Sequence, residues 1–182
     1  MLMLAIVPCI GLADELRGRV VGVADGDTLT VLDAGRQQIK VRLAEIDAPE
    51  KAQPYGQRSK QALSGLCFGR EAIVDNTGRD RYGRTIGRVR CGGVDVNAEQ
   101  IRRGMAWVYD RYVTDKRLYP MQAEAQADRR GLWADAAPVP PWGWRGCKSS
   151  PERSPNWKPC SVPRAAWSRC RPRRPGPAPR RS

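Results

Sequence analysis

The 182-residue sequence contains no histidine and only one phenylalanine, and its acidic residues are outnumbered by basic ones. The absence of histidine excludes a serine-histidine triad, a histidine-based ribonuclease mechanism and a histidine-bound metal. Thirty-two Lys and Arg residues against 19 Asp and Glu give a formal net charge of +13, which favours polyanionic partners. Carboxylate and arginine chemistry is therefore the simplest basis for an active site.

Long hydrophobic runs are also missing. The most apolar stretch, residues 1–13, is too short to cross a bilayer as a helix, so we expect no stable membrane span. It ends in Gly11-Leu12-Ala13, and small residues at these positions favour signal-peptidase cleavage after Ala13. We therefore expect a signal peptide and a secreted, periplasmic or envelope-associated protein, with a buried first strand as the alternative. A chain of this length predicts one folded domain, and we expect a monomer.

Apolar periodicity predicts strands followed by helices. Three strands are expected between Arg19 and Ile46, with a tight turn at Asp25-Gly26 because glycine accepts positive φ. Two further strands are expected near Glu71–Asp75 and Thr85–Arg90. The predicted helices are Pro54–Leu66, Asn97–Arg103 with Asn97 as its cap, and Tyr119–Arg130.

Acidic residues gather beside two of the predicted strand ends. Asp27 follows the turn at Asp25-Gly26, where its side chain is expected to be available for binding. Farther along, Pro49 ends a strand, so Asp47, the Ala48 carbonyl and Glu50 can project from one turn. Carboxylate and carbonyl oxygens are the ligands that calcium prefers. The pattern therefore predicts a calcium site.

Two arginines accompany these carboxylates. Arg42 lies on the face of its strand opposite the apolar residues, and Arg84 closes a glycine-bracketed basic turn, Gly78–Arg84. Two fixed guanidinium groups could hold a phosphodiester from two sides, since their geometry matches phosphate oxygens. In sequence and order, the three stretches resemble the signature of the staphylococcal nuclease family, also called thermonuclease or micrococcal-nuclease-like. The resemblance runs from about Gly18 to Trp133.

This resemblance implies a fold and an activity. The fold is α+β and dominated by a β-barrel: a five-stranded barrel like the oligonucleotide/oligosaccharide-binding fold, with about three helices, over residues 18–135. The implied activity is calcium-dependent endonucleolytic hydrolysis of DNA and RNA to 3′-phosphate ends, with a preference for unpaired strands. The alternative is a noncatalytic barrel of the same fold that binds nucleic acid.

The resemblance also implies roles for individual residues. Asp27, Asp47 and the Ala48 carbonyl would bind Ca²⁺, and Glu50 would orient or deprotonate the attacking water. The family often has threonine where this chain has Ala48, but a backbone carbonyl does not depend on the side chain.

Arg42 and Arg84 would hold the scissile phosphate. Tyr82 would lie near the phosphate of the bound nucleotide, and Tyr109 and Tyr112 both match the position that stacks on a base. The sequence does not choose between these last two.

Five of the six cysteines form two groups. Cys67 and Cys91 lie about equally far from the centre of the basic turn, so a hairpin would place them opposite each other. They form either a disulfide or two small unpaired core residues. The second group contains an odd number of cysteines, and their spacing matches no recognisable zinc site. These are Cys147, Cys160 and Cys170.

Composition changes from Ala136 onward. Eleven of the 15 prolines lie between Pro138 and Pro179, and residues 140–182 contain 11 Lys or Arg against one acidic residue. We expect residues 136–182 to form a disordered basic tail. Its tryptophans and charge would suit nonspecific nucleic-acid binding, and the alternatives are an envelope anchor, a solvated tail or a translated frame slip.

Overall fold

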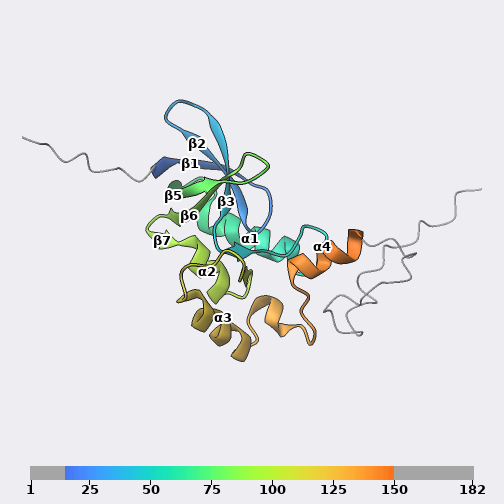
Figure 1. The fold of residues 1–182 in the computed structure, drawn as a ribbon. Helices are drawn as coiled ribbons and strands as arrows, with labels where there is room; N and C mark the ends of the chain where they lie inside the picture. The colour runs from blue at the N-terminus through green and yellow to red at the C-terminus, as the bar shows by residue number, and fades with distance from the viewer. Residues whose placement is uncertain (1–14, 150–182) are drawn as a thin grey trace, which may run out of the picture.

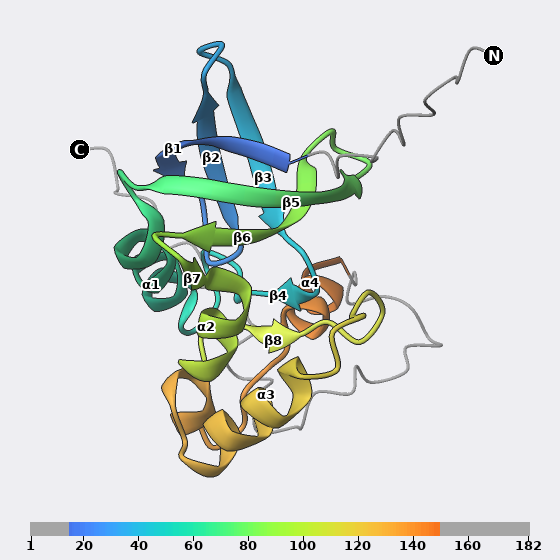
Figure 2. The same cartoon turned by 90° about the vertical axis from the view of Figure 1, so that its left-hand side faces the viewer.

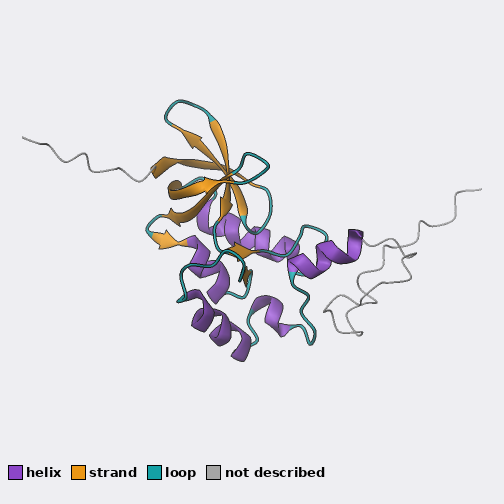
Figure 3. Cartoon of the chain, in the orientation of Figure 1, coloured by secondary structure: helices purple, strands orange, loops and turns teal. Residues whose placement is uncertain are grey.

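The computed structural model describes residues 15–149. The expected signal peptide and residues 150–182 of the expected tail lie outside the described residues, so export and the role of that part of the tail stay predictions. Strands occupy one end of the described part and helices the other (Figure 3). No helix within residues 15–149 is long and apolar enough to cross a membrane.

Five strands form a closed barrel (Figure 1). They pair in the order β3-β2-β1-β5-β6, and β3 also pairs with β6 in parallel, which closes the sheet on itself. The two-residue strand β7 extends the sheet beyond β6, while β4 and β8 pair separately. The strands are β1 Glu15–Val23, β2 Thr28–Asp33, β3 Gln38–Leu43, β4 Ile46–Asp47, β5 Glu71–Arg79, β6 Thr85–Cys91, β7 Val94–Asp95 and β8 Trp107–Val108.

The barrel closes because alternate residues of its strands are apolar. Its interior contains fully buried side chains from every strand, among them Val20, Leu29, Val41, Val74 and Val89. Removing such side chains from water is the main favourable contribution to folding, at about 25 cal/mol per Å² of apolar surface. The predicted α+β class with a five-stranded barrel is confirmed.

The helices lie mainly at one end of the barrel (Figure 2). The helix α2 packs against α1, α3 and β6, so the helices and the sheet share one apolar core. The helical elements are α1 Gly56–Cys67, α2 Val96–Arg102, α3 Leu118–Ala127, the short 3₁₀ helix η1 Gly131–Ala134 and α4 Pro141–Ser149.

All three predicted helices differ in their bounds from the sequence prediction, and α3 is shorter than predicted, since it spans Leu118–Ala127 and not Tyr119–Arg130. Asp95, not Asn97, caps α2, and its carboxylate accepts the backbone N–H of Ala98 at 3.0 Å. Asn97 is fully buried and instead joins Val89 to Ala44 through its side-chain amide, which sequence could not indicate. The first helix begins at Gly56, because Tyr55 before it has a φ of 66° and cannot belong to the helix.

A disulfide joins Cys67 at the end of α1 to Cys91 at the end of β6, with 5.4 Å between the Cα atoms. Both residues are fully buried, so the bond ties the first helix to the barrel inside the core. Trp107 and Trp133 contact each other edge-to-face at 4.3 Å between ring centroids, in the cluster below the barrel.

The largest departure from the sequence prediction is α4. The expected disordered tail begins at Ala136, but residues Pro141–Ser149 form a helix that packs back on the domain. Trp144 is 7% exposed, and the Gln53 side chain donates to the Val139 carbonyl at 2.6 Å. Local composition indicated disorder, but this segment gains its apolar contacts from residues far away in sequence.

Candidate active site

The first candidate side chain, Asp27, lies in the turn between β1 and β2. Gly26 beside it packs so closely that a Cβ there would lie 1.8 Å from the Ser59 hydroxyl, so no other residue fits. The buried Gln100 side chain of α2 donates to the Gly26 carbonyl at 2.7 Å. Helices α1 and α2 therefore fix the turn that presents Asp27.

Asp47 lies in β4 and is 1% exposed. Ala48, the next residue, donates its backbone N–H to Asp27 Oδ2 at 3.0 Å, which brings the two aspartates of the separate motifs together. The other oxygen of Asp27 accepts the Thr28 hydroxyl at 2.9 Å. The predicted pair of metal carboxylates thus converges at one place.

Arg42 lies between these two aspartates. Its guanidinium donates to Asp47 Oδ1 at 2.9 Å and to Asp27 Oδ2 at 3.5 Å. The register of the barrel explains this position, because Arg42 pairs with Thr28 on β2 and with Ile86 on β6. Because β3 lies between β2 and β6, the guanidinium of Arg42 lies next to the two carboxylates.

Arg84 reaches the same place from the opposite side, through the turn between β5 and β6. Asp80 holds its guanidinium at 2.7 Å and also accepts the backbone N–H groups of Tyr82 and Arg84. A further contact of 3.4 Å joins the Arg84 guanidinium to the Thr28 hydroxyl, which is bonded to Asp27. The hydrogen bonds within this turn also hold the pKa of Asp80 below its ordinary value, although desolvation opposes them.

Glu50 lies in the turn after β4, and the N-terminus of α1 packs against it. A Cβ on Gly56 would lie 2.1 Å from the Glu50 carbonyl, and the Gln53 side chain accepts the Glu50 backbone N–H at 3.1 Å. The carboxylate of Glu50 accepts a hydrogen bond from the guanidinium of Arg145 at 2.7 Å. Arg145 belongs to α4 and also donates to Asp47 Oδ2 at 2.6 Å.

Charge and burial act against each other at these carboxylates. Burial raises the pKa of Asp47, its bond from Arg145 lowers it, and the nearby charge of Asp27 raises it again, so the net direction is upward. Burial, and then the charge of Asp27, raises the pKa of Asp25 to about 6. The charged forms of these clustered carboxylates are therefore unfavourable in free energy unless a cation lies beside them.

Two of the three candidate tyrosines contact each other, and the third lies beside Arg84. Tyr82 is 67% exposed and lies beside Arg84, whose guanidinium carbon is 5.6 Å from the ring centroid. Tyr109 and Tyr112 contact each other edge-to-face at 5.0 Å. The ring of Trp142 from α4 stacks on Tyr109, with 5.5 Å between centroids and 7° between planes.

A mostly buried glutamate, Glu45, fixes the loop that carries Tyr109 and Tyr112. The Glu45 carboxylate accepts the backbone N–H groups of Thr114 and Asp115 at 2.7 and 2.8 Å, and the Thr114 hydroxyl as well. These bonds hold the pKa of Glu45 below its ordinary value, although burial opposes them. Arg88 completes the cluster, with contacts to Asp115 at 2.6 Å and to Asp95 at 2.8 Å.

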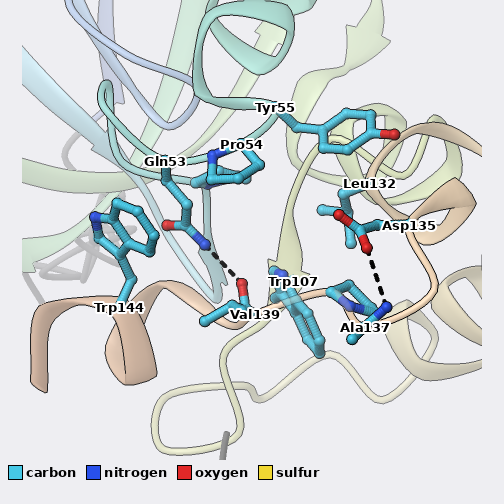
Figure 4. Close-up of a pocket in the computed structure, with 11 residues that line it drawn as sticks. Gln53, Pro54, Tyr55, Trp107, Leu132, Asp135, Ala137, Val139 and Trp144 are labelled. Carbon is cyan, nitrogen blue, oxygen red and sulfur yellow. Dashed lines mark hydrogen bonds between the residues drawn. The ribbon is translucent and has the colours of Figure 1, made fainter. Parts of the chain in front are cut away.

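A small pocket lies under the segment that leads into α4. Figure 4 shows Gln53 pointing to the Val139 carbonyl, with Trp107 and Trp144 among the lining residues. The carboxylate of Asp135 accepts the Ala137 backbone N–H at 3.0 Å. These contacts fix the path of the chain from η1 to α4, so that α4 lies beside β4 (Figure 2).

Trp142 and Arg145 are the side chains at the site that the sequence analysis missed. Composition places both in the expected basic tail, whose tryptophans and charge suit nonspecific nucleic-acid binding. One signal was present, since Pro141 suits the first position of a helix and two tryptophans follow closely. That signal indicates a helix but not where the helix docks.

Comparison with known proteins places the chain in a family. A model of the family described as staphylococcal nuclease homologue matches residues 40–135, which is more than half of the chain. The chain belongs to the staphylococcal nuclease family.

Individual relatives of this nuclease family agree. An "Uncharacterized endonuclease" of Escherichia coli O157:H7 is 48% identical over 135 residues, covering 74% of this chain and 88% of that protein. An "Uncharacterized endonuclease" of Haemophilus influenzae is 48% identical over 127 residues, which cover 70% of this chain and 71% of its own length. A "Micrococcal nuclease" of Shigella flexneri is 44% identical over 142 residues, covering 72% of this chain and 81% of that protein.

The residues present fit the calcium ion that the nuclease family implies, with part of its shell supplied by water. Within residues 15–149, no three side chains of His, Cys, Asp or Glu form a group that could hold a metal ion. The candidate donors are instead two convergent carboxylates, Asp27 and Asp47, and the backbone carbonyl of Ala48, which together would hold the ion. All are hard oxygen ligands, and calcium accepts six to eight oxygens including water.

Proposed function

We propose that this chain is a calcium-dependent endonuclease that hydrolyses DNA and RNA to 3′-phosphate ends. One observation carries the proposal: the five residues that the sequence motifs single out lie in one connected network. Asp27 and Asp47 share the Arg42 guanidinium, Thr28 links Asp27 to Arg84, and Arg145 links Asp47 to Glu50. Family membership and the names of the relatives support an endonuclease.

In this proposal each side chain has a separate task. Asp27, Asp47 and the Ala48 carbonyl hold the calcium ion, which when bound supplies positive charge close to a phosphoryl oxygen. Glu50 accepts the proton of the attacking water. Arg42 and Arg84 donate hydrogen bonds to the phosphate oxygens as negative charge accumulates on them.

The placement of Glu50 supports its role as base. Its side chain is 39% exposed, whereas that of Asp47 is 1% exposed, so of the two carboxylates Glu50 is the one that water and substrate can reach. The exposed Tyr82 and the loop of Tyr109 and Tyr112 flank the network and would contact the nucleotide. A base in a duplex is not available for such stacking, which is the basis of the proposed preference for unpaired strands.

The chemistry of the product ends tests the bond that is cut. We expect the full chain with calcium to convert end-labelled single-stranded DNA and RNA of one sequence into fragments that end in 3′-phosphate. Treatment with a 3′-phosphatase should then retard every fragment on a denaturing gel. Fragments that carry 3′-hydroxyl and 5′-phosphate ends would contradict the proposed cleavage. RNA that stays intact while DNA is cut would restrict the proposal to DNA.

A further inference from the structure

The helix α4 occupies the positions that calcium and a nucleobase need in the proposed site. Its Arg145 guanidinium donates to both oxygens of Asp47, at 2.6 and 3.4 Å, and to Glu50 at 2.7 Å. The Arg42 guanidinium already donates to Oδ1 of Asp47. Both oxygens of the buried carboxylate are therefore engaged by guanidinium groups.

A second contact of α4 covers the aromatic residues. Trp142 stacks face-to-face on Tyr109, one of the two tyrosines expected to receive a base. The other tyrosine, Tyr112, is 57% exposed and contacts Tyr109 edge-to-face. Trp142 therefore covers one ring face of Tyr109 that a base could otherwise use, and this contact is independent of the contact between Arg145 and the carboxylates.

We propose that α4 is an autoinhibitory strap, in which Arg145 substitutes for the metal ion and Trp142 for the nucleobase. The inference rests on the proposed function. Calcium and Arg145 compete for Asp47, since a carboxylate oxygen that accepts a short guanidinium hydrogen bond must lose it, or share it, to ligate a metal. A strand and Trp142 compete for Tyr109 in the same way.

The strap is built to move away without unfolding the domain. The Arg145 side chain is 43% exposed, so its guanidinium can move into solvent, and a bound calcium ion would then supply the positive charge that the buried Asp47 loses. Trp142 is 37% exposed, whereas Trp144 is 7% exposed and the Gln53 contact to Val139 holds the start of the segment. Release of Arg145 and Trp142 therefore requires a shift of α4 and not loss of the barrel core.

Calcium binding without nucleic acid tests the contact with Arg145. We expect the Arg145→Ala full chain to bind calcium at least about 10-fold more tightly than the unmodified chain in isothermal titration calorimetry, because a competing cation is removed. Arg17→Ala is the matched control, since it removes a more exposed arginine that pairs with Glu15 on β1. It should change the dissociation constant by less than about twofold. Equal or weaker calcium binding by Arg145→Ala would overturn the strap.

Binding of a fluorescent oligothymidylate in the presence of chelator tests the contact with Trp142. Trp142→Ala should bind the strand several-fold more tightly, because the face of Tyr109 is then open. Phe68→Ala, which removes another exposed aromatic ring outside the site, should bind as the unmodified chain does. Weaker binding by Trp142→Ala would mean that Trp142 itself holds the strand, and would overturn its role in the strap.

Hydrolysis assays on the same proteins separate the strap from the proposed function. Tighter calcium binding by Arg145→Ala in a chain that cuts no substrate would support the strap and overturn the nuclease. Unchanged calcium binding in a chain that cuts only with calcium would overturn the strap and support the nuclease.

Discussion

Replacement of Arg84 by alanine is expected to lower the rate of calcium-dependent hydrolysis of single-stranded DNA by about 100-fold or more. The guanidinium is held by Asp80 and reaches Thr28, next to Asp27, which we propose as a metal ligand. From that position it can donate two parallel hydrogen bonds to a phosphate whose charge rises in the transition state. Arg84→Lys should recover only a small part of the rate, because an ammonium group keeps the charge but not the two-pronged geometry.

Arg90→Ala is the matched control for Arg84→Ala. Arg90 lies near the end of β6, the strand that follows Arg84, and forms an ion pair with Asp75 of the neighbouring strand β5, with 3.0 Å between the guanidinium and the carboxylate. It lies away from the carboxylate network, so its loss should change the rate by less than about twofold and the stability by at most about 1 kcal/mol. Comparable rate losses in Arg84→Ala and Arg90→Ala would mean that Arg84 acts through stability alone.

Replacement of Glu50 by glutamine is expected to lower the rate by about 100-fold or more, because the amide cannot accept the proton of the attacking water. The substitution keeps the size of the side chain and an oxygen that can accept the Arg145 hydrogen bond. Calcium affinity should change little, since Glu50 is not assigned as a metal ligand. Rate and calcium affinity measured on the same preparation therefore separate the loss of a base from the loss of a ligand.

Glu124→Ala serves as the control for Glu50→Gln. Glu124 of α3 is another exposed glutamate bonded to an arginine, with 2.8 Å between its carboxylate and the guanidinium of Arg130. Its loss should leave the rate within about twofold of the unmodified chain. Full activity of Glu50→Gln would refute the assignment of Glu50 as the base.

The barrel could be predicted because its strands carry their own signals. Alternating apolar residues, the glycine in the turn before Asp27 and the proline after Ala48 fix strand and turn positions locally. The order of the motifs then identifies the family, and with it the closure of β3 on β6. The convergence of Asp27, Asp47 and Arg42 follows from that closure and not from any single motif.

The contacts of α4 could not be predicted, because they depend on partners distant in sequence. Proline and basic residues around Trp142 and Arg145 are typical of disordered chains, and no periodic apolar pattern indicates a docked helix. Its anchors are Gln53 and Tyr109, which lie more than 30 residues away in the chain. The buried Asn97, which joins β6 to the turn after β3, was misread as a cap for the same reason.

The most direct test of the account is hydrolysis of single-stranded DNA by the full, disulfide-bonded chain with calcium, with chelator, and with calcium restored after chelation. Glu50→Gln is assayed beside it under the same conditions. A calcium-dependent nuclease should cut with calcium, stop in chelator and recover when calcium is restored, and the variant should show little activity throughout. Binding of the strand without cutting in calcium by both the unmodified chain and Arg145→Ala, or cutting that continues in chelator, would contradict a calcium-dependent nuclease.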